Sequence, residues 1–185
     1  MDVRRVRADE WRAVRDFRYE AVRDPDAAIA FLETPESLDQ RDEAVWRDRT
    51  TRAATSDQGA QFAALDAQTW IGSLTVLIRD VDAVDHLGRT VEQRRADVVG
   101  VYVQPAHRGK GVVDALLAAA VDWAAAAGMD VVGLDVHVDN VRAQAAYRRF
   151  GFTPTGVTTA GPTGLELGFA MKLDSRRAGQ QERPG

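Results

Sequence analysis

Apolar residues recur at helical spacing in the first third of the chain. From Asp9 to Val22 they return every three to four positions, with arginines on the other faces, which predicts an amphipathic helix. An Asp-Pro pair at 24–25 ends this helix, because proline disfavours helical geometry in the residue before it. A second helix is predicted over residues 37–54, entered through a Thr-Pro-Glu-Ser run, and residues 1–7 form a candidate first strand.

The middle of the chain has the composition of strands. Two apolar, β-branched runs, 62–65 and 70–78, are separated by Asp-Ala-Gln-Thr, which predicts a hairpin. The polar stretch 79–95 that follows is too long for a tight turn and too charged for a core element. It is predicted to be a loop that either frames a substrate site or only connects two strands.

The strongest pattern begins at residue 96. Residues 96–104 have the composition of a buried strand, a loop with two glycines follows, and apolar residues then return at helical spacing over 112–128. Another buried strand is predicted over 129–138, and because a helix connects the two strands they are expected to lie parallel. The remaining predicted elements are a helix and two strands, at 140–150, 152–159 and 165–173. The predicted fold class is therefore α/β with a mixed sheet.

Composition narrows the class of protein. The chain has 185 residues, 45% of them hydrophobic and 28% charged, with a formal net charge of −4, which is typical of a single-domain globular protein. These totals predict neither a nucleic-acid partner nor a membrane span, which needs ~20 consecutive apolar residues. The lack of cysteine excludes disulfides, thiolate metal sites and a cysteine nucleophile. A cytoplasmic location is expected because the arginine-containing start has no apolar core behind it, and polar residues 174–185 are predicted to form a mobile tail.

A glycine-rich loop, Arg-Gly-Lys-Gly at 108–111, leads from a strand into the long helix. The start of a helix presents unpaired N–H groups and the positive end of the helix dipole, and both favour an anion such as a phosphate. The loop matches neither the Walker A pattern G-x-x-x-x-G-K-[ST] nor the dinucleotide pattern G-x-G-x-x-G. ATP and NAD are therefore disfavoured as ligands.

Asn140 and Tyr147 lie seven positions apart on a predicted helix, with the small Ala143 between them. Such positions differ by only about 20° around the helix and about 10 Å along it, so the amide and the phenol share one face. This arrangement suits an extended ligand with a hydrogen bond at each end. Alternatively, Asn140 only caps the helix and Tyr147 is only a core aromatic residue.

These residues together resemble the GNAT superfamily of N-acetyltransferases. The resemblance rests on V-Y-V-Q-P-A-H-R-G-K-G-V at 101–112 and on L-x-V-x-x-x-N-x-x-A-x-x-x-Y-x-x-x-G-F at 134–152. The closing E-x-x-x-x-M, which begins at Glu166, and the order of the elements fit as well, so residues 1–173 are expected to form one GNAT domain. Ala106 and Val113 depart from residue types common in the family, and these departures bear on cofactor affinity more than on ligand identity.

The resemblance implies a mixed sheet whose two central parallel strands, here about 96–104 and 130–138, splay apart so that acetyl-CoA lodges in the gap. The resemblance also implies that a backbone segment of the first strand binds the pantetheine arm and polarises the acetyl carbonyl, here Val101, Tyr102 and Val103. It further implies that backbone amides of the following loop bind the pyrophosphate, here those of Arg108, Gly109, Lys110, Gly111, Val112 and Val113. Asn140 would contact the pantetheine, and Tyr147 would protonate the departing thiolate.

Acetyl transfer to an amine needs a deprotonated amine, stabilisation of an oxyanion and a proton for the leaving sulfur. Cysteine is lacking and no serine lies in a G-x-S-x-G setting, so direct attack in a ternary complex is predicted. Tyr147 is the candidate acid, since an ordinary tyrosine pKa of about 10 keeps the phenol protonated at neutral pH.

Two residues are candidates for the general base. Asp97 lies where some GNAT enzymes carry a catalytic glutamate, and the alternative is a structural or substrate-positioning carboxylate. His137 on the neighbouring strand is the other candidate, unless it is structural. His107 is expected to meet phosphate or solvent. The spacing of the histidines, at 86, 107 and 137, does not match a metal site, so no metal is predicted.

The expected activity is acetylation of a primary amine on a small molecule. The alternatives are acetylation of a peptide N-terminus or lysine and, in another class, a non-catalytic acyl-CoA-binding sensor. Arginines 12, 15 and 18 of the first helix could attract an acidic substrate or simply form its exposed face. Residues 31–37 are expected near the acceptor. A homodimer through the edge of the final strands is compatible with the sequence, which does not specify it.

Overall fold

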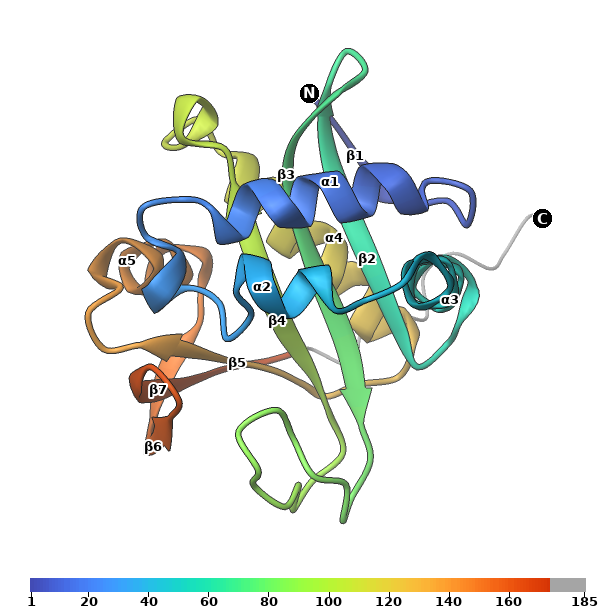
Figure 1. The fold of residues 1–185 in the computed structure, drawn as a ribbon. Coiled ribbons are helices and arrows are strands. Elements are labelled where there is room, and N and C mark those ends of the chain that lie inside the picture. Colours follow the sequence, from blue (N-terminus) through green and yellow to red (C-terminus); the bar gives the residue numbers. More distant parts are fainter. Residues whose placement is uncertain (174–185) are drawn as a thin grey trace, which may run out of the picture.

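A seven-stranded mixed sheet forms the centre of the protein in the computed structural model, which describes residues 1–173 (Figure 1). The strands are β1 (Asp2–Arg5), β2 (Gly59–Asp66), β3 (Thr69–Arg79), β4 (Arg95–Val103), β5 (Val131–His137), β6 (Thr153–Gly161) and β7 (Gly164–Lys172). The helices are α1 (Trp11–Val22), α2 (Pro35–Asp39), α3 (Glu43–Thr55), α4 (Val112–Ala126) and α5 (Val141–Phe150), with short 3-10 turns η1 (Ala27–Ile29) and η2 (Pro105–His107). The tail predicted over 174–185 lies outside the described residues.

The strands are ordered β1-β2-β3-β4-β5-β7-β6 across the sheet. Every neighbouring pair is antiparallel except β4 and β5, which are parallel and connected through α4. The predicted mixed sheet and its parallel pair are therefore confirmed.

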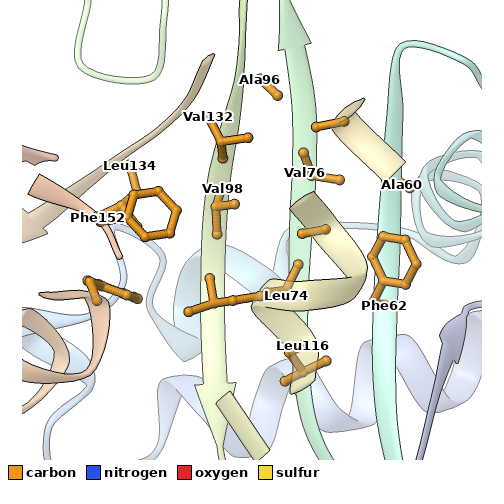
Figure 2. Close-up of a cluster of buried hydrophobic side chains, with 14 of the residues drawn as sticks. Ala60, Phe62, Leu74, Val76, Ala96, Val98, Leu116, Val132, Leu134 and Phe152 are labelled. Atoms are coloured by element: carbon orange, nitrogen blue, oxygen red, sulfur yellow. The ribbon is translucent and has the colours of Figure 1, made fainter. Parts of the chain in front are cut away.

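Helices cover both faces of the sheet. In Figure 1, α1 and α2 cross in front of the strands and α4 lies behind them. An apolar cluster fills the space between α4 and the strands, and Figure 2 shows Leu116 of α4 at one end of it, below Leu74, with Val76 and Val98 further along the strands. A second cluster joins α1 and α3 to the opposite face. Because both faces are covered, the central strands have almost continuous apolar sequences.

The single helix predicted over 37–54 is wrong, because the structure has two helices there, α2 and α3, with a break between them. Thr34 caps α2, where its hydroxyl accepts from the backbone N–H of Ser37 at 3.3 Å. Asp42 caps α3 in the same way, since its carboxylate accepts from the N–H of Val45 at 2.9 Å. A second capping residue inside an apolar pattern starts a new helix, and the periodicity alone does not show it.

The polar loop over residues 80–94 is more ordered than its composition predicts. Val91 is fully buried, and Val84 forms an isolated bridge with Thr90. Arg89 binds the carboxylate of Asp85 within the loop and reaches Asp135 on β5 at 2.6 Å. Charged residues can enter this region because they neutralise one another. In the described part of the chain, no helix is long and apolar enough to span a bilayer.

Candidate active site

A cavity of about 800 Å³ opens where β4 and β5 separate. The two strands pair only at Ala96 with Val132 and at Asp97 with Gly133. Beyond Asp97, the edge of β4 that faces β5 has no strand partner in the described chain, whereas β5 stays paired with β7 along its whole length. The predicted splaying of the central strands is confirmed, and it leaves main-chain groups of β4 able to bind a ligand.

A β-bulge reshapes β4 beside this cavity. The register between β3 and β4 slips by one residue there, and Gly100 adopts a φ of +62°. A Cβ at Gly100 would lie 3.3 Å from Nη1 of Arg18, so glycine serves both the backbone conformation and the close approach of α1. The bulge also turns Tyr102 toward α1, while Val101 and Val103 face the α4 cluster.

The three β4 residues predicted to bind through their backbone, Val101, Tyr102 and Val103, all line the cavity. The Val103 carbonyl already accepts from Nε of Arg108 at 3.0 Å. The hydroxyl of Tyr102 donates to Glu20 at 3.3 Å, and burial together with nearby carboxylates raises the pKa of Tyr102. Their binding role stays a prediction, for which the free edge of β4 is the supporting geometry.

The loop before α4 presents a row of free amides. Within the described chain, the N–H groups of residues 109–114 have no backbone acceptor, as expected for the first turn of a helix. Gly109 and Gly111 have φ values of +72° and +78°, which favour glycine. The loop therefore has the predicted form of an anion site. Lys110 does not line the cavity, whereas the other predicted loop residues do, namely Arg108, Gly109, Gly111, Val112 and Val113.

Arg108 fastens the loop to the N-terminal part of the chain. Its guanidinium binds the carboxylate of Asp24 at 2.6 Å, and its own amide donates to the carbonyl of Pro105 at 3.3 Å. Arg108 thus offers no free amide, in contrast to Gly109 and the residues that follow it.

Asn140 at the start of α5 and Tyr147 within it both line the cavity. Each also has the structural role that was the alternative, since Asn140 caps the helix and Tyr147 packs in the core. Oδ1 of Asn140 caps α5 by accepting from the N–H of Ala143 at 3.1 Å, and Nδ2 donates to the carbonyl of Ile29 at 3.3 Å. The Tyr147 ring packs edge-on against Phe152 with 6.2 Å between centroids. Its hydroxyl has no hydrogen-bond partner in the described chain, and burial raises the pKa of Tyr147, which keeps the phenol protonated.

The two candidate bases are both engaged by other groups. Asp97 does not line the cavity; Arg95 donates to its Oδ1 at 2.7 Å, and Arg79 lies 3.5 Å from Oδ2. Nδ1 of His137 accepts from a backbone N–H at 3.2 Å, and Nε2 faces the carbonyl of Thr163 at 3.2 Å. A carbonyl only accepts, so Nε2 is the donor in this contact. These contacts favour structural roles, and a basic role for either residue stays a prediction.

The arginines of α1 take different places. Arg12 is exposed and stacks on Trp11, as expected for the outer face of an amphipathic helix. Arg18 instead lies in the cavity wall and forms an ion pair with Glu33. Burial alone would raise the pKa of Glu33, but Arg18, Arg49 and Arg41 together lower it to about 2. Part of the predicted acceptor segment 31–37 is thus placed at the cavity.

Sequence reasoning missed three polar residues that line the cavity. These are His86 on the 80–94 loop, Asp135 on β5 and Glu166 on β7. Asp135 is bound by Arg89, and His86 approaches it to 3.8 Å. The signal for Asp135 was its alternation with apolar neighbours on β5, where it shares a face with His137.

The chemistry of this cavity fits acetyl-CoA. The free amides of residues 109–114 suit a pyrophosphate, and the unpaired edge of β4 offers hydrogen-bonding groups to a pantetheine amide chain. Small side chains of α5, Ala143 and Ala146, line the slot between them. In the described chain, no group of His, Asp or Glu residues is arranged to hold a metal ion.

Comparisons with known proteins agree with this geometry. The model of the acetyltransferase (GNAT) family matches residues 18–152. An aminoglycoside N(6')-acetyltransferase type 1 from Stenotrophomonas maltophilia is 36% identical over 107 residues, which are 57% of this chain and 67% of that protein. A mycothiol acetyltransferase from Clavibacter michiganensis subsp. michiganensis is 38% identical over 94 residues, which are 49% of this chain and 31% of that protein.

Solved structures share the fold. A GNAT superfamily phosphinothricin acetyltransferase from Sinorhizobium meliloti in complex with AcCoA aligns with a TM-score of 0.71 at 20% identity, over 100% of this chain and 92% of that one. The chain belongs to the acetyltransferase (GNAT) family. It is accordingly an acetyl-CoA-dependent N-acetyltransferase, and acetyl-CoA is its co-substrate.

Replacing Gly109 with alanine tests the loop. A Cβ at Gly109 meets no other atom within 4 Å, so it would project into open space beside the free amides and would also strain a positive φ. We expect the dissociation constant of acetyl-CoA, measured by calorimetry, to rise about tenfold. Gly128→Ala is the matched control, because Gly128 has a φ of +75° and equally open surroundings at the far end of α4. Equal affinity loss in both variants would contradict the assignment of the loop.

Proposed function

We propose that the protein transfers the acetyl group of acetyl-CoA directly to a primary amine on a small molecule. The observation that carries the proposal is that the free loop amides, the unpaired edge of β4 and the hydroxyl of Tyr147 all meet in one cavity. The relative from Stenotrophomonas maltophilia, whose name specifies an aminoglycoside, is in line with a small amine acceptor.

The acceptor side of the cavity is walled by three segments, which favours a small molecule over a peptide. The connection from α1 to α2 is held across the gap by the bond from Asn140 to Ile29 and by an ion pair of 2.8 Å between Asp26 and Arg142. The 80–94 loop is held to β5 by Arg89. Thr163, between β6 and β7, completes the wall.

The reaction proceeds by direct displacement in this proposal. The deprotonated amine nitrogen attacks the thioester carbonyl, a C–N bond forms, and the C–S bond breaks as the tetrahedral intermediate collapses. Backbone N–H groups at the β4 bulge stabilise the oxyanion, and the Tyr147 hydroxyl gives its proton to the departing thiolate. The proton that the amine loses passes to solvent or to a carboxylate on the acceptor side.

A thiol-release assay with acetyl-CoA and a panel of amines and peptides tests the proposal. We expect turnover with at least one small primary amine, and mass spectrometry should show a product heavier by one acetyl group. Turnover confined to peptides would support the protein-acetylating alternative. Binding of acetyl-CoA by calorimetry, without turnover on any acceptor, would instead support a sensor and contradict the proposal.

A further inference from the structure

Glu166 lies near the start of β7, on the acceptor side of the cavity. It is 8% exposed and pairs in register with His137 of β5, so both side chains project from the same face of the sheet. In the described part of the chain, its carboxylate makes no hydrogen bond and no ion pair. Three side chains in the described chain, those of Arg41, Thr50 and Arg79, have a fully buried polar atom without a hydrogen-bond partner. The Glu166 oxygens also lack a partner but are not fully buried, so the carboxylate is accessible from the cavity that it lines.

The other buried carboxylates around this cavity have cationic partners. Asp135 binds Arg89 at 2.6 Å, and Asp97 binds Arg95 at 2.7 Å. Further pairs are Asp85 with Arg89, Glu33 with Arg18 and Asp24 with Arg108. His137, opposite Glu166, makes no hydrogen bond or ion pair with it in the described chain, because its two nitrogens contact a backbone N–H and the carbonyl of Thr163. Glu166 is therefore a buried carboxylate at this cavity that has no ion pair within the described residues.

A buried carboxylate without a cation is costly to the folded state. Removal from water disfavours the charged form, and burial accordingly raises the pKa of Glu166; the nearby His137 opposes this rise and Asp135 adds to it, and the net direction is upward. A cationic ligand in the cavity would remove this cost, because it would replace the water that the carboxylate has lost with a charge-assisted hydrogen bond.

We propose that Glu166 binds the ammonium group of the acceptor, and that the acceptor is an aliphatic primary amine. Such an amine has an ordinary pKa of about 10 and arrives as a cation with three N–H donors. An aryl amine, which is uncharged at neutral pH, would not form this charged contact. The inference deepens the proposed acetyl transfer and rests on it. Glu166 acts here as a specificity-determining residue, whose effect falls on the binding of the acceptor.

Thermal unfolding without acetyl-CoA tests the binding role separately from turnover. The probes are diaminobutane and phenylethylamine as cations, with butanediol and aniline as uncharged counterparts. We expect at least one cation, and neither counterpart, to raise the unfolding midpoint of the wild type. Glu166→Gln should abolish this rise without lowering the midpoint of the free protein, since it removes an unpaired charge and keeps the shape. Glu92→Gln is the control, because Glu92 is an exposed carboxylate of the 80–94 loop and should leave the rise intact.

Steady-state kinetics supply the second measurement. With an active amine, we expect Glu166→Gln to raise the acceptor KM about tenfold or more while the acetyl-CoA KM is unchanged, and Glu166→Asp to recover part of the loss. The proposal is overturned if no cation protects the wild type, if Glu166→Gln retains the protection, or if Glu166→Gln markedly lowers the midpoint of the free protein. Failure of acetyl transfer itself would appear differently, as a wild type that neither binds acetyl-CoA nor turns it over.

Discussion

Replacing Tyr147 with phenylalanine is expected to lower kcat by about 100-fold or more and to leave acetyl-CoA affinity nearly unchanged. The ring packs against Phe152 and is retained in the variant, whereas the hydroxyl has no partner in the described chain whose loss would cost stability. Only the proton donor is removed, so the departing thiolate must leave unprotonated or take its proton from water. Stopped-flow or steady-state thiol release gives kcat, and calorimetry gives the affinity.

Tyr19→Phe is the control for this experiment. The Tyr19 hydroxyl donates to Asp39 at 2.7 Å on the outside of α1, away from the cavity, so its loss should leave kcat unchanged. Wild-type turnover in Tyr147→Phe would remove Tyr147 as the acid. A parallel fall of kcat in both variants would point to a general effect on folding instead.

Replacing Arg89 with methionine is expected to lower the free energy of unfolding by about 3–5 kcal/mol. Arg89 donates to Asp85 at 2.8 Å, to both oxygens of Asp135 and to the hydroxyl of Thr159 at 3.1 Å. The Asp85 side chain is fully buried, so loss of the guanidinium leaves buried carboxylates without their main cation. Denaturant unfolding measures the change, and Arg94→Met is the matched control.

Arg94 belongs to the same loop, but its ion pair with Asp80 is exposed on both sides and should cost less than about 1 kcal/mol. The decrease in the free energy of unfolding caused by Arg89→Met should also become smaller at acidic pH. Burial would raise the pKa of Asp85, but hydrogen bonds from Arg89 outweigh it and lower that pKa. A carboxyl whose pKa is lower in the folded protein stabilises the fold at pH values above its ordinary pKa of about 3.9. This stabilisation disappears as the pH falls below that value and through the lowered pKa. Equal losses in the two variants, or a loss that does not vary with pH, would contradict this account.

Local patterns predicted most elements within a few residues. The helix predicted over 112–128 is α4 at 112–126, and the strand predicted over 96–104 is β4 at 95–103. Both predictions succeeded because apolar periodicity and the glycines that end elements act over a few neighbouring residues. The strand predicted at 62–65 is β2 at 59–66, and its start was missed because Gly, Ala and Gln carry no strand signal. Pairing with β3 makes these residues a strand.

Predictions about side-chain partners depended on more distant parts of the chain. The helical pattern of α1 places Arg18 on the predicted exposed face of the helix, yet its guanidinium lies against Gly100 at the β4 bulge. Asp97 was predicted as a candidate base, but Arg79 of the neighbouring strand β3 and Arg95 of its own strand β4 both contact it. The approach of Arg18 to Gly100 and that of Arg79 to Asp97 do not follow from spacing along one element, because each joins segments that only the folded structure brings together.

The sequence by itself determined the order of helices and strands, the glycine loop, and the pairing of Asn140 with Tyr147 on one helix. These features arise from hydrophobic period, turn residues and helix geometry, which are short-range properties. Only the tertiary structure decided which charges are neutralised. Arg89 meets the carboxylate of Asp135, 46 positions further along the chain, and Glu166 has no ion pair within residues 1–173. Charge pairing in a buried site depends on three-dimensional distance and on exclusion of water, and both exist only once the sheet, the loop and α1 have come together.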